Sequence, residues 1–79
     1  MFNHVNTYEF NGKTYKVKHG DPFDRGSADS YYGRGRMPHK GGVGGDSGPR
    51  IEDLTLEEFN AYNAGYDWNE RYGDKKNYG

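Results

Sequence analysis

A run of cations and tyrosines in the middle of the chain has the residue types that bind single-stranded nucleic acid. The run comprises Tyr31, Tyr32, Arg34, Arg36, Lys40 and Arg50. Arginine and lysine neutralise phosphates, and tyrosine rings stack on unpaired bases. The run therefore predicts a surface that binds RNA. Because the net charge of the chain is −1, the alternative is a solvated loop whose positive charge balances acidic flanking segments.

Two patterns typical of enzymes occur in the same part of the chain, and neither has the residues that it requires. The segment GGDSGP around Ser47 is like the nucleophile segment of trypsin-like proteases. In such a protease two barrels hold the histidine and the aspartate, and they do not fit into 79 residues. The glycine run lacks the lysine–hydroxyl pair of a phosphate-binding loop. We therefore expect no catalytic residue and no enzymatic activity.

A metal or cofactor site is not expected either. His4, His19 and His39 lack the i, i+4 or His-x-His spacing of metal ligands, and the chain has no cysteine. The absence of cysteine is compatible with the cytoplasm, where we expect the protein. The sequence contains no apolar run long enough to span a membrane, so we expect no membrane partner.

A β-hairpin over residues 5–18 is the first element predicted to position these residues. Asn11 and Gly12 form the strongest short-range hairpin signal, because a type I′ turn needs positive φ at both central positions. This turn pairs Tyr8 with Tyr15 and brings the apolar side chains to one face. They are Tyr8, Phe10, Tyr15 and Val17. A lone hairpin is barely stable, so this face must pack on another element.

A short helix is predicted over residues 21–33. Asp21 before Pro22 is typical of an N-cap followed by a first-turn proline, and Gly33 is placed to end the helix. One side of this helix carries Phe23, Ser27, Ser30 and Tyr31. Gly26 and the serines keep that side small, which suits the close approach of another helix.

A second helix is predicted over residues 55–72. Thr55 and Glu58 form a capping box, and Gly73 is placed to end the helix. Gly65 lies in the middle, where glycine costs about 1 kcal/mol relative to alanine. We interpret Gly65 as a point where the first helix comes close, near Gly26.

The aromatic side chains of the second helix cover about half of its circumference. One small neighbouring element does not hide so large a surface, so we expect part of it to bind a protein partner. The residues predicted for this interface are Tyr62, Tyr66, Trp68 and Tyr72. A homo-oligomer formed through the same face is a further alternative.

These elements predict one α+β domain over residues 1–79, in which the hairpin packs on two helices. A long, flexible glycine-rich loop over residues 34–50 is expected to join the helices, and it is either disordered or wrapped around the domain. Residues 74–79 form a polar tail. Hydrophobic residues are 30% of the chain but aromatic residues reach 16%, so the core must be built mainly from rings.

Residues 21–79 resemble a group of small, functionally uncharacterised proteins of phage and phage-derived type. The resemblance is carried by PFDRGSADSYYGR, PH, LTLEE, AYNAGYDWNE and GDKKNYG. The same region is weakly similar to ribosome modulation factor, a small helical protein that binds ribosomes. That similarity is carried by Arg25, Gly26, Ala28, Gly33, Arg34, Pro38, His39, Ala64, Gly65 and Tyr66. It implies a shared two-helix core, although that family is strongly basic and lacks the hairpin.

We therefore expect a non-enzymatic binding module of phage type that engages a host macromolecule in the host cytoplasm. RNA or the ribosome is the favoured partner, through the basic run. The alternative is an inhibitor or adaptor of a host protein, which would bind through the aromatic face of the second helix.

Overall fold

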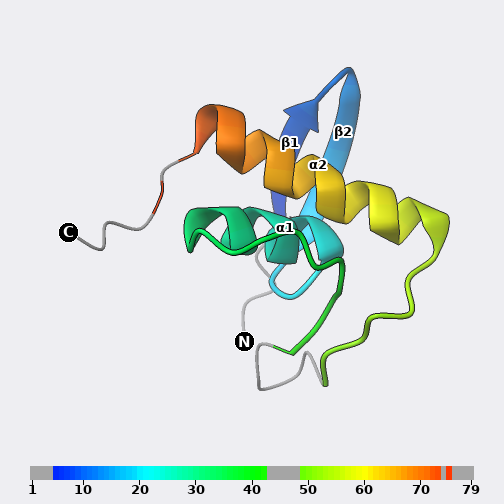
Figure 1. The fold of residues 1–79 in the computed structure, drawn as a ribbon. Coiled ribbons are helices and arrows are strands. Elements are labelled where there is room, and N and C mark those ends of the chain that lie inside the picture. Colours follow the sequence, from blue (N-terminus) through cyan, green and yellow to red (C-terminus); the bar gives the residue numbers. More distant parts are fainter. Residues whose placement is uncertain (1–4, 43–48, 74, 76–79) are drawn as a thin grey trace.

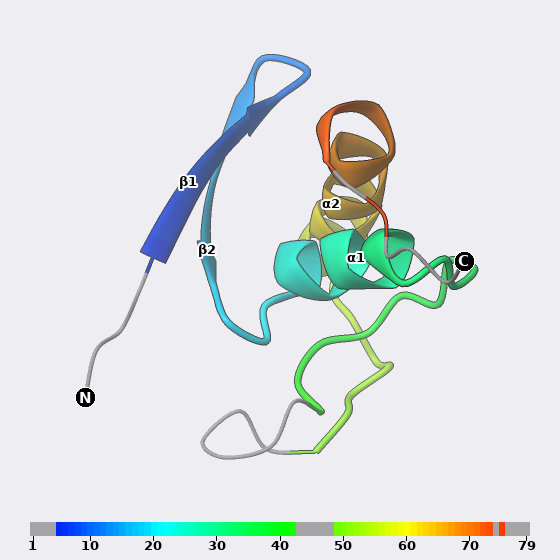
Figure 2. The same cartoon turned by 90° about the vertical axis from the view of Figure 1, so that its left-hand side faces the viewer.

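The chain has the predicted α+β architecture in a computed structural model that describes residues 5–42, 49–73 and 75 (Figure 1). Its elements are β1 (Val5–Phe10), β2 (Lys13–Lys18), α1 (Pro22–Tyr31) and α2 (Leu56–Tyr72). The hairpin stands beside the two helices, which cross each other (Figure 2). The most extensive contact between elements outside the hairpin is that of α1 with α2.

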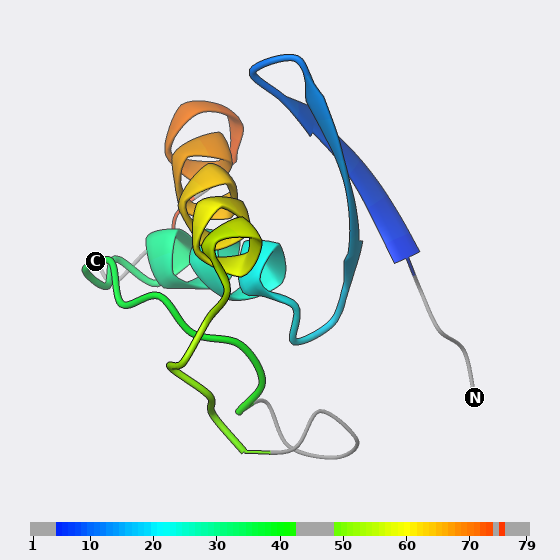
Figure 3. The same ribbon diagram turned by 90° about the vertical axis from the view of Figure 1, so that its right-hand side faces the viewer.

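The predicted hairpin and its register are confirmed. Asn11 and Gly12 have φ of 53° and 78°, as a type I′ turn requires. Tyr8 pairs with Tyr15 across the antiparallel strands. One face of the hairpin is turned towards the helices and the other towards solvent (Figure 3).

The core is built mainly from aromatic rings, as the composition predicts. Its buried residues include Phe10 and Val17 from the hairpin and Phe23 from α1. The ring of Tyr8 stacks on that of Phe23 with 4.8 Å between centroids, and Trp68 of α2 meets Tyr8 edge-on at 4.8 Å. Each such pair adds about 0.5–1.5 kcal/mol beyond the apolar area that it buries. These contacts join the hairpin to both helices.

Two glycines bring the backbones of α1 and α2 into contact. A Cβ on Gly26 would lie 2.0 Å from the carbonyl oxygen of Tyr62, and a Cβ on Gly65 would lie 2.0 Å from that of Phe23. No side chain fits at either position without moving a helix. The predicted close approach at Gly26 and Gly65 is confirmed.

The ends of α2 are where the sequence places them. Thr55 Oγ1 accepts the N–H of Glu58 at 3.1 Å, and Glu58 Oε1 accepts the N–H of Thr55 at 2.9 Å, so the capping box is complete. Gly73 ends the helix with φ −92°, which is not the left-handed region. A Cβ there would lie 2.0 Å from Asn69 Oδ1, so a larger residue would require the buried Asn69 side chain to shift.

The start of α1 differs from the prediction. Asp21 occupies the N-cap position, but its carboxylate accepts the N–H of Lys18 at 2.9 Å and makes no cap bond to the helix. Asp24 likewise accepts the N–H of Gly20 at 2.9 Å. The predicted side-chain cap is wrong because the connection between β2 and α1 is short, and its own N–H groups take the carboxylates. Gly33 follows the helix with φ +72°.

The described part of the 34–50 loop is tied to the rest of the domain. Lys40 and Ile51 form an antiparallel bridge with two N–H to carbonyl bonds of 2.9 Å. Gly41 donates its N–H to the carbonyl of Gly20 at 2.8 Å. Residues 43–48, which include Ser47, lie outside the described residues, as do His4 and all of the 74–79 tail except Lys75.

Candidate nucleic-acid interface

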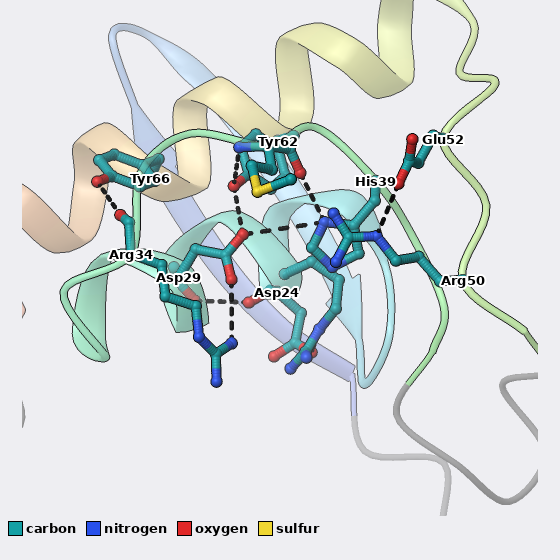
Figure 4. Close-up of polar contacts among 11 residues, drawn as sticks. Asp24, Asp29, Arg34, His39, Arg50, Glu52, Tyr62 and Tyr66 are labelled. Carbon is teal, nitrogen blue, oxygen red and sulfur yellow. Dashed lines mark hydrogen bonds and ion pairs between the residues drawn. The ribbon is translucent and has the colours of Figure 1, made fainter.

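A buried polar cluster joins α1, α2 and the loop between them (Figure 4). Asp29 of α1 is 4% exposed and Tyr62 of α2 is 0% exposed. The Tyr62 hydroxyl donates to Asp29 Oδ2 at 2.5 Å and accepts the N–H of Met37 at 3.0 Å. The other oxygen of Asp29 accepts from Arg34 Nη1 at 3.2 Å. Burial, and then the bond to Asp29, raise the pKa of Tyr62 far above its usual value, so the hydroxyl stays protonated as a donor.

His39 completes this cluster from the loop. Its side chain is buried, and Nδ1 lies 2.7 Å from the carbonyl oxygen of Met37 and 3.8 Å from Asp29 Oδ2. Since a carbonyl only accepts, we assign the proton to Nδ1. Every buried side-chain nitrogen or oxygen in the described part of the chain has a partner. The cluster therefore holds residues 34–39 against the helices.

Above this cluster lies an open hollow of about 190 Å³, which we call the arginine hollow. It is lined by Arg25, Asp29, Arg34, Gly35, Met37, His39, Gly41, Gly42 and Arg50. Arg25 comes from α1, while Arg34 and Arg50 come from the two ends of the loop. Gly42 allows the middle of the loop to lie against Arg50, because it has φ +73° and a Cβ there would lie 2.9 Å from the Cβ of Arg50.

Each arginine of the hollow already has one acidic partner. Arg25 pairs with Asp24 at 3.1 Å, and Arg50 pairs with Glu52 at 3.1 Å. Neither of these carboxylates lines the hollow. The acidic side chain that does line it is Asp29. The Arg50–Glu52 pair is exposed, and such pairs are worth about 0–1 kcal/mol, so a phosphate can compete for the guanidinium N–H groups of Arg50.

The predicted tyrosines flank this site. Tyr31 and Tyr32 are exposed, and their rings meet edge-on at 4.9 Å between centroids. The guanidinium of Arg34 lies over the Tyr32 ring, 4.8 Å from its centroid. The structure thus brings Arg34, Arg50 and Tyr32 to one region of the surface.

Arg36 and Lys40 were predicted for the same surface, but neither lines the hollow. Arg36 pairs with Asp67 of α2, which raises the pKa of the guanidinium, and it lies 4.4 Å from the centroid of the Tyr66 ring. Lys40 pairs with Glu58. Both cations attach the loop to α2.

Arg25 and His39 line the site but were not predicted as nucleic-acid contacts. A signal for Arg25 was present, because Arg25 and Asp29 are four residues apart and share one face of α1. No local pattern indicates His39, since its position depends on how the loop closes on Tyr62.

The predicted protein interface on α2 needs correction. Tyr62 cannot contact a partner because it is completely buried. Trp68 is packed against the core, and Tyr66 donates its hydroxyl to the carbonyl of Arg34 at 2.5 Å. Only Tyr72 of the four is largely exposed, at 62%. With few aliphatic residues available, the domain uses these rings for its own packing.

Comparison with known protein families, with curated proteins and with solved structures finds no match to this chain. The function must therefore be argued from the site itself. No helix in the described ranges has the length and apolar character needed to cross a membrane. The described histidines and carboxylates form no group of three that could hold a metal ion.

Proposed function

We propose that the protein is a non-enzymatic RNA-binding module whose arginine hollow binds neighbouring phosphates of the RNA backbone. The observation that carries this proposal is the convergence of Arg25, Arg34 and Arg50 on one hollow. Guanidinium groups bind phosphate oxygens through paired N–H donors, and such contacts position an RNA strand.

The surroundings of the hollow fit a single-stranded ligand. Tyr31 and Tyr32 offer exposed rings on which an unpaired base can stack. Arg34 is oriented by Asp29 and by the Tyr32 ring, so little side-chain freedom is lost on binding. The weak similarity to ribosome modulation factor supports the ribosome of a host cell as the source of this RNA, and the phage-type resemblance supports a phage protein.

The test is a titration of labelled single-stranded RNA over a range of salt concentrations. With three phosphate contacts, the logarithm of the binding constant should fall against the logarithm of salt with a slope of about −2. Arg50→Gln should weaken binding and reduce the size of the slope by about 0.7. The variant should remain folded, because the Arg50 side chain is exposed and its carboxylate partner is Glu52.

Two variants serve as controls in the same titration. Arg71→Gln removes an equal charge from the last turn of α2, away from the hollow, and should leave the slope unchanged. Phe59→Ala alters an exposed apolar side chain and should also leave RNA binding unchanged. Salt-insensitive binding, or no binding at low salt, would contradict the proposal.

A second candidate function is the binding of a host protein. It is favoured by an open hollow of about 350 Å³ at the start of α2, lined by Met37, Pro38, Arg50, Glu52, Leu54 and Phe59. Met37 and Phe59 are 56% and 45% exposed and line the same hollow, so together they form a small exposed apolar patch. Loss of a protein complex on Phe59→Ala, together with no binding of labelled single-stranded RNA by the unsubstituted protein, would favour this function over RNA binding.

A further inference from the structure

The outer edge of β2 carries backbone N–H and C=O groups that form no hydrogen bonds with another described strand. The backbone N–H and C=O of Lys18 face away from β1. The N–H donates to Asp21 Oδ2 at 2.9 Å, and the carbonyl accepts the N–H of Asp21 at 3.0 Å. Backbone direction alternates along an antiparallel strand, so the N–H and C=O groups of Thr14 and Lys16 point the same way. Among the described residues, no hydrogen bond beyond the hairpin reaches the backbone of either residue.

A groove of about 220 Å³ runs beside this edge. Its lining comes from β2, from the start of α1 and from the first turns of α2: Lys13, Thr14, Tyr15, Lys16, Val17, Asp21, Pro22, Phe23, Glu57, Glu58 and Ala61. β2 lies towards the N-terminal half of α2 and β1 towards its C-terminal half (Figure 1). The groove thus has unpaired strand backbone on one side and a helix on the other.

We propose that this groove binds an extended peptide that adds a third strand to the hairpin at β2. The N–H and C=O groups of Thr14 and Lys16 would form the ladder with the peptide backbone. Such strand addition derives affinity from main-chain bonds and specificity from alternate side chains. This binding site is separate from the arginine hollow and shares no lining residue with it.

The charges of the groove define the side chains of the peptide. Lys16 and Lys18 project from the outer face of β2, so the outward side chains of an added strand should be acidic. Glu57 and Glu58 line the opposite wall, and Lys40 pairs with Glu58. This wall disfavours acidic side chains directed inward.

The inward side chains of the peptide should be small and apolar. They would meet Tyr15, Phe23 and Ala61, which line the inner part of the groove. The favoured ligand is therefore a strand in which acidic and small apolar residues alternate.

A second copy of this chain fits the edge poorly. Pairing β2 with β2 of another molecule would bring Lys16 and Lys18 close to their counterparts, and lysines on a strand edge oppose such pairing. The edge of β1 presents Glu9 on its outer face, and among the described residues the groove beside β2 takes no lining residue from β1.

Amide hydrogen exchange measured by NMR tests the proposal directly. In the free protein, the amides of Thr14 and Lys16 should exchange rapidly, whereas those of Tyr15 and Val17 should be protected by β1. A short capped peptide in which valine and glutamate alternate should slow exchange at Thr14 and Lys16. The same peptide should leave the amides of the β1 edge unchanged, and a peptide in which valine and lysine alternate should have no effect.

A matched pair of proline variants locates the binding edge. Thr14→Pro removes one outward N–H from β2, and Thr7→Pro removes one from β1; proline is tolerated where a strand N–H faces solvent. Thr14→Pro should weaken peptide binding about tenfold, the loss expected for one hydrogen bond, while Thr7→Pro should have no effect. Lys16→Glu tests the charge without changing the backbone and should also weaken binding.

Several outcomes would overturn the proposal. They are the absence of binding by the valine–glutamate peptide, equal binding by the valine–lysine peptide, and protection at Thr7 and Glu9 in place of Thr14 and Lys16. Protection of Thr14 that rises with protein concentration in the absence of peptide would assign the edge to self-association. If Thr14→Pro does not fold, Lys16→Glu and the two peptides still decide the question.

Discussion

Single polar groups hold the loop of this protein in place. The Tyr62 hydroxyl contacts Asp29 of α1 and Met37 of the loop, although Tyr62 itself belongs to α2. The aromatic periodicity of α2 predicts that this ring is on an apolar stripe, but it does not indicate which polar groups the hydroxyl meets. Those partners come from residues 25 and 33 positions away in the sequence, so no local pattern contains them.

Tyr62→Phe should destabilise the fold by about 1–3 kcal/mol, because it leaves a buried carboxylate oxygen and a loop N–H without their partner. Urea denaturation followed by circular dichroism measures the loss. Tyr66→Phe is the control, since the Tyr66 hydroxyl donates to the Arg34 carbonyl at the exposed surface. Equal and small losses in both variants would show that the buried cluster does not stabilise the loop.

At the scale of elements, local signals specify most of the structure. The turn at Asn11 and Gly12 sets the hairpin register, the box of Thr55 and Glu58 sets the start of α2, and Gly65 indicates the crossing point of the helices. The site is less predictable because it depends on how a long loop closes. Lys40 pairs with Ile51 and His39 lies against Tyr62, and neither contact leaves a pattern in the sequence.

Gly65→Ala should destabilise the protein even though alanine favours a helix by about 1 kcal/mol relative to glycine. The added Cβ would lie 2.0 Å from the carbonyl oxygen of Phe23, so α1 and α2 must separate. We expect a net loss of about 1–3 kcal/mol in the free energy of unfolding, measured by urea denaturation. Gly35→Ala is the control, because a Cβ there has open space around it. A stabilised Gly65→Ala variant would disprove the close crossing.

At the scale of the whole molecule, two glutamates on α2 link it to other parts of the chain. Glu58 pairs with Lys40 of the loop. Glu70 pairs with Lys75 and accepts the hydroxyl of Ser30 at 2.6 Å. Hydrogen bonds from Lys40 lower the pKa of Glu58, and those from Lys75 and Ser30 lower the pKa of Glu70.

Because of these lowered pKa values, the stability of the folded protein should depend on pH. A carboxylate whose pKa is lower in the folded state stabilises the protein above its unfolded value of 4.5, and this contribution is lost as the pH falls through the folded value. The melting temperature should therefore decrease as the pH is lowered below 4.5, as followed by circular dichroism. Glu70→Gln should reduce this decrease in melting temperature. Glu57→Gln is the control and should leave the decrease unchanged, because Glu57 is exposed and has no ion pair among the described residues. A melting temperature that is constant over this range would contradict the expectation.

The position of Trp68 has a practical consequence for studying how this domain assembles. It is the sole tryptophan of the chain, and its ring meets Tyr8 of the hairpin and Phe23 of α1. Its emission spectrum is therefore a built-in reporter for docking of the hairpin onto the helices. Recording fluorescence and ellipticity on the same sample would reveal whether the strands detach before the helical pair melts.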